Sequence, residues 1–185
     1  EQSSEVVPHL RMLDAISLDS SDFKRLLHGG VTTVYVSPDS VNVIGPRGTI
    51  LKTGGPREKR VVEAEAAVKV SLGDDPSQRG QSNYMPPSYG PPPSFLTRRP
   101  NTRMGVDFVF RKAFYDARRH ADGLPMVGAD APPLAAVPVL QDILAGKVPI
   151  RVQARMQHDI FTALRLTRDL GIPFVLEEAT EAYRC

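Results

Sequence analysis

The sequence predicts an α/β fold, in which parallel strands form a sheet that helices cover on its outside. Strand-like and helix-like segments alternate four or five times along the 185 residues. Residues 148–176 have the order and length of one strand–helix–strand unit. Apolar residues between Val106 and Ala117 recur at the spacing of one helix face. We therefore expect one domain over residues 1–185, with a sheet that is either open or closed as a barrel.

The first part of the chain predicts one helix and several short extended segments. Ser20 and the two residues after it are typical of a helix start, and Gly29-Gly30 of its end. The β-branched run at 31–36 is too short for anything but a strand. The further elements expected here are two extended segments at 41–44 and 49–52, a helix at 58–67 and a strand at 68–72.

The second part of the chain has stronger periodicity. Pro149 to Ala154 and Ile172 to Leu176 are short apolar runs typical of strands. Three amphipathic helices are expected, around 106–117, around 139–144 and over 160–170, the last two ended by Gly146 and Gly171.

A proline-rich stretch separates these two parts. Residues 74–101 include Met85-Pro86-Pro87 and Pro91-Pro92-Pro93, and proline excludes both a helix and a central strand. We interpret the stretch as a surface insertion. A segment that binds a partner through residues 86–93 is an alternative, and deleting it would then abolish binding but leave the fold intact.

Composition excludes several classes of protein. The formal charge is +2, which is too balanced for a strongly basic nucleic-acid-binding protein. No apolar run is long enough to span a membrane, so a soluble chain is expected. The lone Cys185 cannot form an intramolecular disulfide, which favours the cytoplasm but does not exclude the periplasm.

Common catalytic and metal-binding signatures are missing. The sequence has no nucleophile elbow, zinc-protease or dinucleotide-binding motif. Its histidines are not paired at metal-ligand spacing, and we expect none to bind a metal: His9, His28, His120 and His158. The basic group of Arg98, Arg99 and Arg103 is interpreted as a solvated loop.

Whole phrases of the sequence are more specific than these motifs. Gly30 to Pro38 reads GVTTVYVSP, and Leu51 to Gly55 reads LKTGG. Together with later phrases in the same order, they resemble the imidazolonepropionase-related branch of the metal-dependent amidohydrolase superfamily. The later phrases lie at 68–73, 102–105, 148–152, 159–165 and 179–183.

This resemblance implies a TIM-type (β/α)₈ barrel with one or two divalent metals at its strand ends. In that family a metal-bound water attacks a carbonyl or imine carbon and cleaves a carbon–nitrogen bond. Relatives have a His-x-His pair before the matching part and a metal-binding Asp after it. We therefore expect about five of eight strands, with the chain a piece of a longer protein or its open edges covered by a second copy.

The chain departs from the family at two predicted strand ends. Relatives have His-Ala-His-Arg where this chain has Gln153-Ala154-Arg155-Met156, and Glu-His-Ala-Thr-Glu where it begins Glu177-Glu178. Gln153 and Glu178 thus replace two metal-binding histidines, and a glutamine amide is a poor zinc ligand. Lys69 lies on the strand that carries a carboxylated lysine in some relatives, although an ordinary strand lysine is an equal interpretation.

The leading hypothesis is an amidohydrolase-like pseudoenzyme with a binding or structural role and no cofactor. Its candidate pocket residues are Lys69, Gln153, Arg155 and Glu178. The alternative is an active hydrolase of carbon–nitrogen bonds that uses zinc, with ligands from missing segments or a partner chain.

Overall fold

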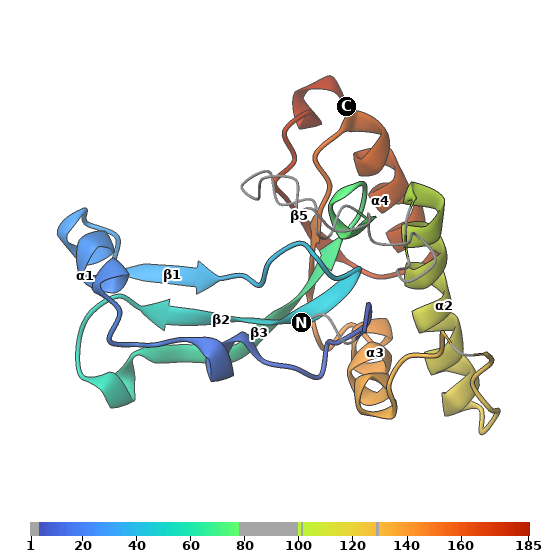
Figure 1. The fold of residues 1–185 in the computed structure, drawn as a ribbon, viewed down its shortest axis with the longest axis horizontal. Coiled ribbons are helices and arrows are strands. Elements are labelled where there is room, and N and C mark those ends of the chain that lie inside the picture. The colour runs from blue at the N-terminus through green and yellow to red at the C-terminus, as the bar shows by residue number, and fades with distance from the viewer. Residues whose placement is uncertain (1–3, 78–99, 101, 129) are drawn as a thin grey trace, which may run out of the picture.

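An α/β body and a long antiparallel arm make up the fold (Figure 1). The computed structural model describes residues 4–77, 100, 102–128 and 130–185. Its helices are α1 (Ser21–His28), α2 (Arg103–Ala121), α3 (Val137–Leu144) and α4 (Gln157–Leu170). Its strands are β1 (Thr33–Val36), β2 (Ile44–Lys52), β3 (Val61–Ser71), β4 (Ile150–Gln153) and β5 (Phe174–Glu177). Short 3₁₀ helices are η1 (Met12–Ala15), η2 (Arg57–Lys59), η3 (Asp75–Ser77), η4 (Leu134–Ala136) and η5 (Ala182–Arg184).

The five strands form one curled sheet in the order β1-β2-β3-β4-β5. β1, β2 and β3 pair antiparallel, whereas β3, β4 and β5 pair parallel. The long strand β3 belongs to both parts, because it begins in the arm and ends beside β4 (Figure 1). The carboxyl ends of the three parallel strands therefore meet at one edge of the body.

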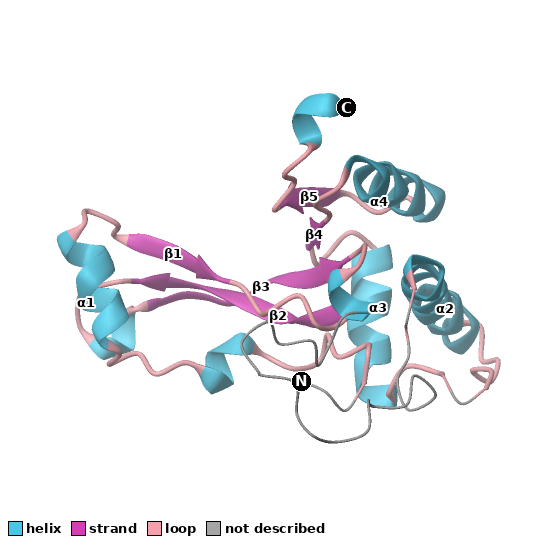
Figure 2. Cartoon of the chain, turned by 45° about the horizontal axis from the view of Figure 1, so that its top comes forward, coloured by secondary structure: helices cyan, strands magenta, loops and turns pink. Residues whose placement is uncertain are grey.

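Helices α2, α3 and α4 lie on one side of the parallel strands (Figure 2). The strand residues that face them are fully buried and apolar, namely Val68, Val70, Ile150 and Val152. The helices contribute their apolar stripes to the same core, including Phe110, Phe114, Leu140, Ile143, Ile160 and Leu166. This apolar layer holds β3, β4 and β5 in place and so positions their carboxyl ends.

Local sequence signals explain where these helices begin and end. The Ser20 hydroxyl accepts a hydrogen bond from the amide of Asp22 at the start of α1. Thr102 caps α2 in the same way, through Gly105 N at 3.2 Å. Gly171 ends α4 in the left-handed conformation, with φ 71°. These predicted helices are confirmed.

The helix expected at 58–67 is wrong, because residues 61–71 are strand β3. The segment is rich in Ala and Glu, which favour helices, but its backbone pairs with β2 on one side. The extended segment expected at 49–52 is the end of the longer strand β2, whereas only Ile44 of the segment expected at 41–44 is in that strand and residues 41–43 form bends. A register shift between Ile44 and Arg47 accommodates Pro46, which has no N–H to donate.

The expected all-parallel sheet is also corrected. Connections 37–43 and 53–60 are shorter than the dozen or so residues that a parallel crossover needs, so β1, β2 and β3 form antiparallel pairs. Of the five strands that the structure describes, β3, β4 and β5 are parallel.

Most of the proline-rich stretch, residues 78–99 and 101, lies outside the described residues. Among the helices that the structure describes, none is long and apolar enough to cross a membrane.

Candidate functional site at the strand ends

The candidate site lies on the face of the parallel strands that points away from the helices. Ser71, Gln153 and Glu177 are register partners at the ends of β3, β4 and β5, so their side chains share this face. Lys69 and Arg151 share it as well, because each lies two residues earlier on its strand. Alternate residues of the same strands therefore build a polar face opposite the apolar core.

Lys69 is the most buried charge of this face. Its side chain is 1% exposed, and its ammonium group donates hydrogen bonds to Glu177 and, at 3.1 Å, to Glu178 Oε1. A buried ammonium group costs several kcal/mol unless anions surround it. The two carboxylates thus hold the Lys69 cation in the protein interior, and the contact to Glu177 links β3 with β5 across β4.

Glu178 has an unusual backbone conformation, and its carboxylate contacts two cations. Its φ of 51° is in the left-handed region, which residues other than glycine seldom adopt. One carboxylate oxygen accepts from Lys69 and the other from Arg155 Nη2 at 2.7 Å. Burial alone would raise the pKa of Glu178, but the hydrogen bonds from Arg155 and Lys69 outweigh it and lower the pKa below its ordinary value. Glu178 is therefore an ionised bridge between β3 and the loop that follows β4.

Gln153 connects η3, the short helix after β3, to this network. Its side-chain amide, 1% exposed, donates to Asp75 Oδ2 at 2.6 Å, and Arg155 lies 3.3 Å from the same oxygen. Within the part of the chain that the structure describes, Gln153 Oε1 and Ser71 Oγ have no hydrogen-bond partner. Two buried oxygen atoms on adjacent strands are thus left as acceptors without a donor.

Arg151 and Tyr35 extend the network toward the arm. Arg151 donates to Glu177 Oε2 at 2.7 Å, and its guanidinium group lies 4.5 Å from the centre of the Tyr35 ring. Burial is the main cause that raises the pKa of Tyr35 to about 12, and the charge of Glu177 adds to it. The Tyr35 ring lies across Gly48, where any Cβ would overlap it. The missing side chain of Gly48 is what lets the Tyr35 side chain lie over β2 and contact Arg151 on β4.

The assembled network is electrically balanced. Three cations face three carboxylates: Lys69, Arg151 and Arg155 with Asp75, Glu177 and Glu178. Each of the three carboxylates already accepts from a cation or from Gln153. The chemistry that this arrangement supports best is the recognition of polar groups at the exposed end, where Arg155 and Glu178 are 50% and 42% exposed.

The described side chains do not fit a divalent metal. Among residues 4–77 and 100–185, as far as they are described, no group of three or more His, Cys, Asp or Glu side chains is placed to hold one. Lys69 contacts both Glu177 and Glu178, and Glu178 is one of the two positions at which a metal ligand is replaced. His158 is near this edge but contacts Asp159 at 3.3 Å, and Asp159 also pairs with Arg103 at 2.8 Å.

The structure brings all four predicted pocket residues into one network, although their role in binding stays a prediction. Prediction from the sequence missed Glu177 as a partner of Lys69, although strand alternation could have placed both on one face. It also missed Asp75 and Tyr35, which reach the site from distant segments that carry no local signal. Arg103, expected in a solvated loop, is instead the first residue of α2 and is ion-paired with Asp74 and Asp159. Arg98 and Arg99 lie outside the described residues.

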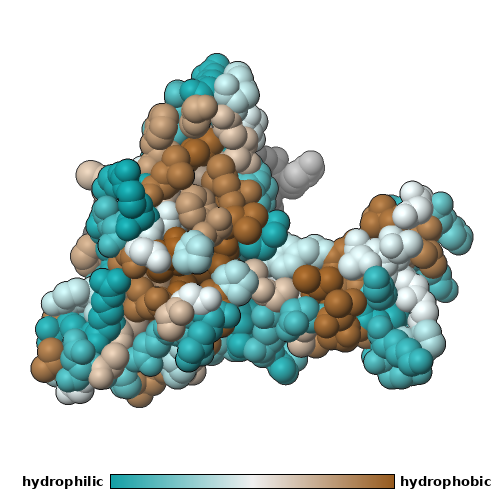
Figure 3. All heavy atoms as spheres, turned by 180° about the vertical axis from the view of Figure 1, so that it is seen from behind, coloured by the Kyte–Doolittle hydropathy of each residue, from teal (hydrophilic) through white to brown (hydrophobic). Residues whose placement is uncertain are grey.

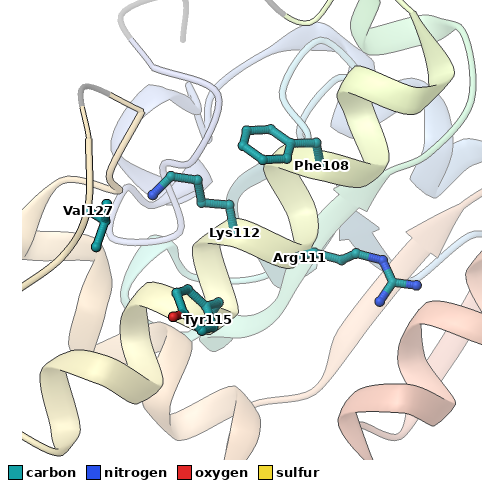
Figure 4. Close-up of a pocket in the computed structure, with 5 residues that line it drawn as sticks. All are labelled: Phe108, Arg111, Lys112, Tyr115 and Val127. Carbon is teal, nitrogen blue, oxygen red and sulfur yellow. The ribbon is translucent and has the colours of Figure 1, made fainter.

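A separate hollow of about 430 Å³ lies on the outer side of α2 (Figure 4). It is lined by Phe108, Arg111, Lys112, Tyr115 and Val127. Both cations already have partners: Lys112 pairs with the buried Asp116, and Arg111 with Asp169 at 3.1 Å. The hollow therefore offers mainly apolar surface and contains none of the predicted pocket residues.

Comparison with known proteins supports the fold. No protein-family model matches the chain, and no curated protein matches it. A solved structure, an amidohydrolase from Thermotoga maritima MSB8, matches all of this chain with 28% identity and a TM-score of 0.80. The chain spans 46% of the length of that protein. The curled five-stranded sheet is thus amidohydrolase-like and consistent with part of such a barrel.

Proposed function

We propose that this chain is an amidohydrolase-like half-barrel of the imidazolonepropionase-related branch that has a binding or structural role and does not catalyse metal-dependent hydrolysis. The observation that carries the proposal is the ion pairing of Lys69 with Glu177 and Glu178 at the ends of the parallel strands. An ammonium group lies where the carboxylates would otherwise be free to bind a cation.

Charge balance supports this proposal. A divalent ion would add two positive charges to a network in which cations and carboxylates are already equal in number. It would also have to compete with the Lys69 ammonium for both carboxylates. Repulsion between buried like charges makes such binding unfavourable.

The donor atoms support the same conclusion. Gln153, at a position where relatives of the resembling family have a histidine, uses its amide nitrogen to donate to Asp75. The amide nitrogen has no lone pair available for zinc, and the neighbouring Arg155 adds a permanent positive charge. We propose that Gln153, Arg155 and Glu178 instead line a polar pocket without a metal.

Metal analysis of the purified protein tests the proposal. We expect substoichiometric zinc in the wild type, and no zinc binding when the protein is titrated by calorimetry. Glu178→Ala is the diagnostic variant, and Glu63→Ala, at an exposed position of β3, is its control. Stoichiometric zinc in the wild type and in Glu63→Ala, lost in Glu178→Ala, would overturn the proposal.

A working hydrolase is the second candidate, favoured by the name of the Thermotoga protein and by the 46% coverage. In that case residues outside this chain would supply most of the metal ligands. Turnover of N-acyl amino acids or cyclic amides, abolished by a chelator, would support this candidate over the first.

The outer edge of β5 is the surface we propose for a partner. Within the described residues β5 pairs only with β4. Three apolar side chains on α4 and β5 are about half exposed, with 51% for Phe161, 45% for Leu164 and 48% for Val175. Figure 3 shows apolar areas on the body. We propose that a second copy or the remaining segment of a barrel covers this edge in the cytoplasm, and light scattering of the purified chain tests for the second copy.

A further inference from the structure

We propose that Lys69 acts as a built-in counter-ion in place of a divalent metal, and that removing its ammonium group exposes a site for a hard divalent cation. The inference deepens the proposed function and rests on it. It starts from the position of Lys69, which extends from β3 across β4 to Glu177 on β5.

The bracing of the strand ends is the first argument. Through Glu177 the ammonium group ties β3 to β5, and through Glu178 to the loop after β5. Arg155 continues the chain of contacts from Glu178 to Asp75 on η3. Lys69 and Arg155 together thus hold segments that come from three parallel strands, as a metal bound at the same edge would do.

The oxygen atoms on the polar strand face are the second argument. Two carboxylate oxygens contact Lys69, and two neutral oxygens on the same strand face have no hydrogen-bond partner in the described part of the chain: Gln153 Oε1 and Ser71 Oγ. All four are oxygen atoms, and no histidine or cysteine is among them. Oxygen-only sites favour Mg²⁺, Mn²⁺ and Ca²⁺ over zinc.

The charge of the network is the third argument. With Lys69 the cations and carboxylates are equal in number, so the wild-type network attracts no further cation. Without the ammonium group one carboxylate charge is uncompensated. A small residue at position 69 would also leave space at the place that the ammonium group occupies, because the whole side chain is buried.

The test uses three variants of the full chain with Mn²⁺ as the probe. Lys69→Ala removes the charge and leaves space, whereas Lys69→Met removes the charge but fills the space. Lys147→Ala is the control, since Lys147 forms an exposed ion pair with Asp142. Mn²⁺ binding is measured by electron paramagnetic resonance, and thermal unfolding is measured in Mn²⁺ and in chelator.

We expect Lys69→Ala to bind one Mn²⁺ at least about tenfold more tightly than the wild type or Lys69→Met. Its unfolding temperature should lie below that of the wild type in chelator and rise when Mn²⁺ is added. Adding Glu177→Gln to Lys69→Ala should abolish both the tighter Mn²⁺ binding and the rise in unfolding temperature with Mn²⁺. Lys147→Ala should behave like the wild type.

Several outcomes would overturn the inference. The first is that Lys69→Ala is as stable as the wild type in chelator. The second is that Lys69→Ala and Lys69→Met bind Mn²⁺ equally well. The third is that Lys69→Ala still binds Mn²⁺ after Glu177→Gln is added. If Lys69→Ala does not fold in chelator, the readout is the yield of refolding from urea, and equal yields with and without Mn²⁺ overturn the inference. Stoichiometric zinc in the wild type is a different result, because it contradicts the proposed function itself.

Discussion

The two faces of β3 and β4 are stabilised in different ways, although successive residues of the same strands form them in alternation. The face toward the helices presents Val68, Val70 and Ile150, which are fully buried in an apolar layer. The opposite face presents Lys69 and Gln153, which are equally buried but polar. Burial stabilises the first face directly, whereas it stabilises the second only as far as each charge and amide finds a partner.

Truncating the apolar face should have the largest effect. Phe110 on α2 is fully buried and packs edge-to-face on Phe114 at 5.0 Å between ring centres. We expect Phe110→Ala to lower the free energy of unfolding by about 3–5 kcal/mol, measured by urea denaturation. Phe108→Ala on the same helix is the control, because Phe108 is 54% exposed. Similar losses in both variants would contradict the described packing.

Neutralising one charge on the polar face should be the next largest change. Glu177→Gln keeps the size of the side chain but leaves Lys69 with Glu178 alone and weakens the contact with Arg151. We expect a loss of about 2–4 kcal/mol in unfolding free energy, because a buried cation loses most of its compensation. Glu63→Gln, exposed on β3, should change stability by less than about 0.5 kcal/mol. If Glu177→Gln leaves the free energy of unfolding unchanged, the ion pairs of Glu177 do not stabilise the fold.

Adding a side chain at Gly48, which lies on β2, should disturb the polar face through Tyr35. Its Cβ would overlap the Tyr35 ring, so Gly48→Ala should displace the ring from Arg151. We expect a loss of about 1–2 kcal/mol, since Tyr35 can move part of the way. Gly29→Ala is the control, because its φ of −79° suits any residue and its Cβ would meet nothing closer than 3.4 Å. Equal denaturation midpoints for the two variants would argue against the Tyr35–Gly48 packing.

The dependence of stability on alkaline pH should be the smallest of these effects. Burial raises the pKa of Tyr35 to about 12, so the folded state favours the protonated phenol. Its contribution to stability is complete below about pH 10, the ordinary pKa, and is lost as the pH rises from there to about 12. We expect Tyr35→Phe to abolish at most about 1 kcal/mol of this pH dependence in urea denaturation between about pH 9 and pH 11, because the partial exposure of Tyr35 reduces the effect. The matched variant Tyr183→Phe, at a 78% exposed position, should leave the pH dependence unchanged.

Prediction from sequence succeeded where a pattern is local and regular. The stripe of α2 around Phe110 has a helical period, and β4 and β5 lie in short apolar runs typical of strands, so the predicted type of each element is correct. It failed at 58–67, where alanines and glutamates fit a helix but backbone pairing with β2 decides for a strand. The resemblance to amidohydrolases pointed to the strand ends, and the four residues found there do lie in one network.

Periodicity, caps and turns along the chain account for the alternation of strands and helices and for the apolar side of the core, because each depends on neighbours within a few residues. The partners of the polar side are a different matter. Lys69 meets Glu177 from 108 positions along the chain, and Gln153 meets Asp75 from 78 positions away. Such contacts depend on the curl of the sheet, and no local pattern encodes it. The sequence alone leaves open whether Lys69 is a metal-site lysine or an ion-paired lysine. The fold decides this, since only the fold brings the carboxylates of Glu177 and Glu178 to its ammonium group.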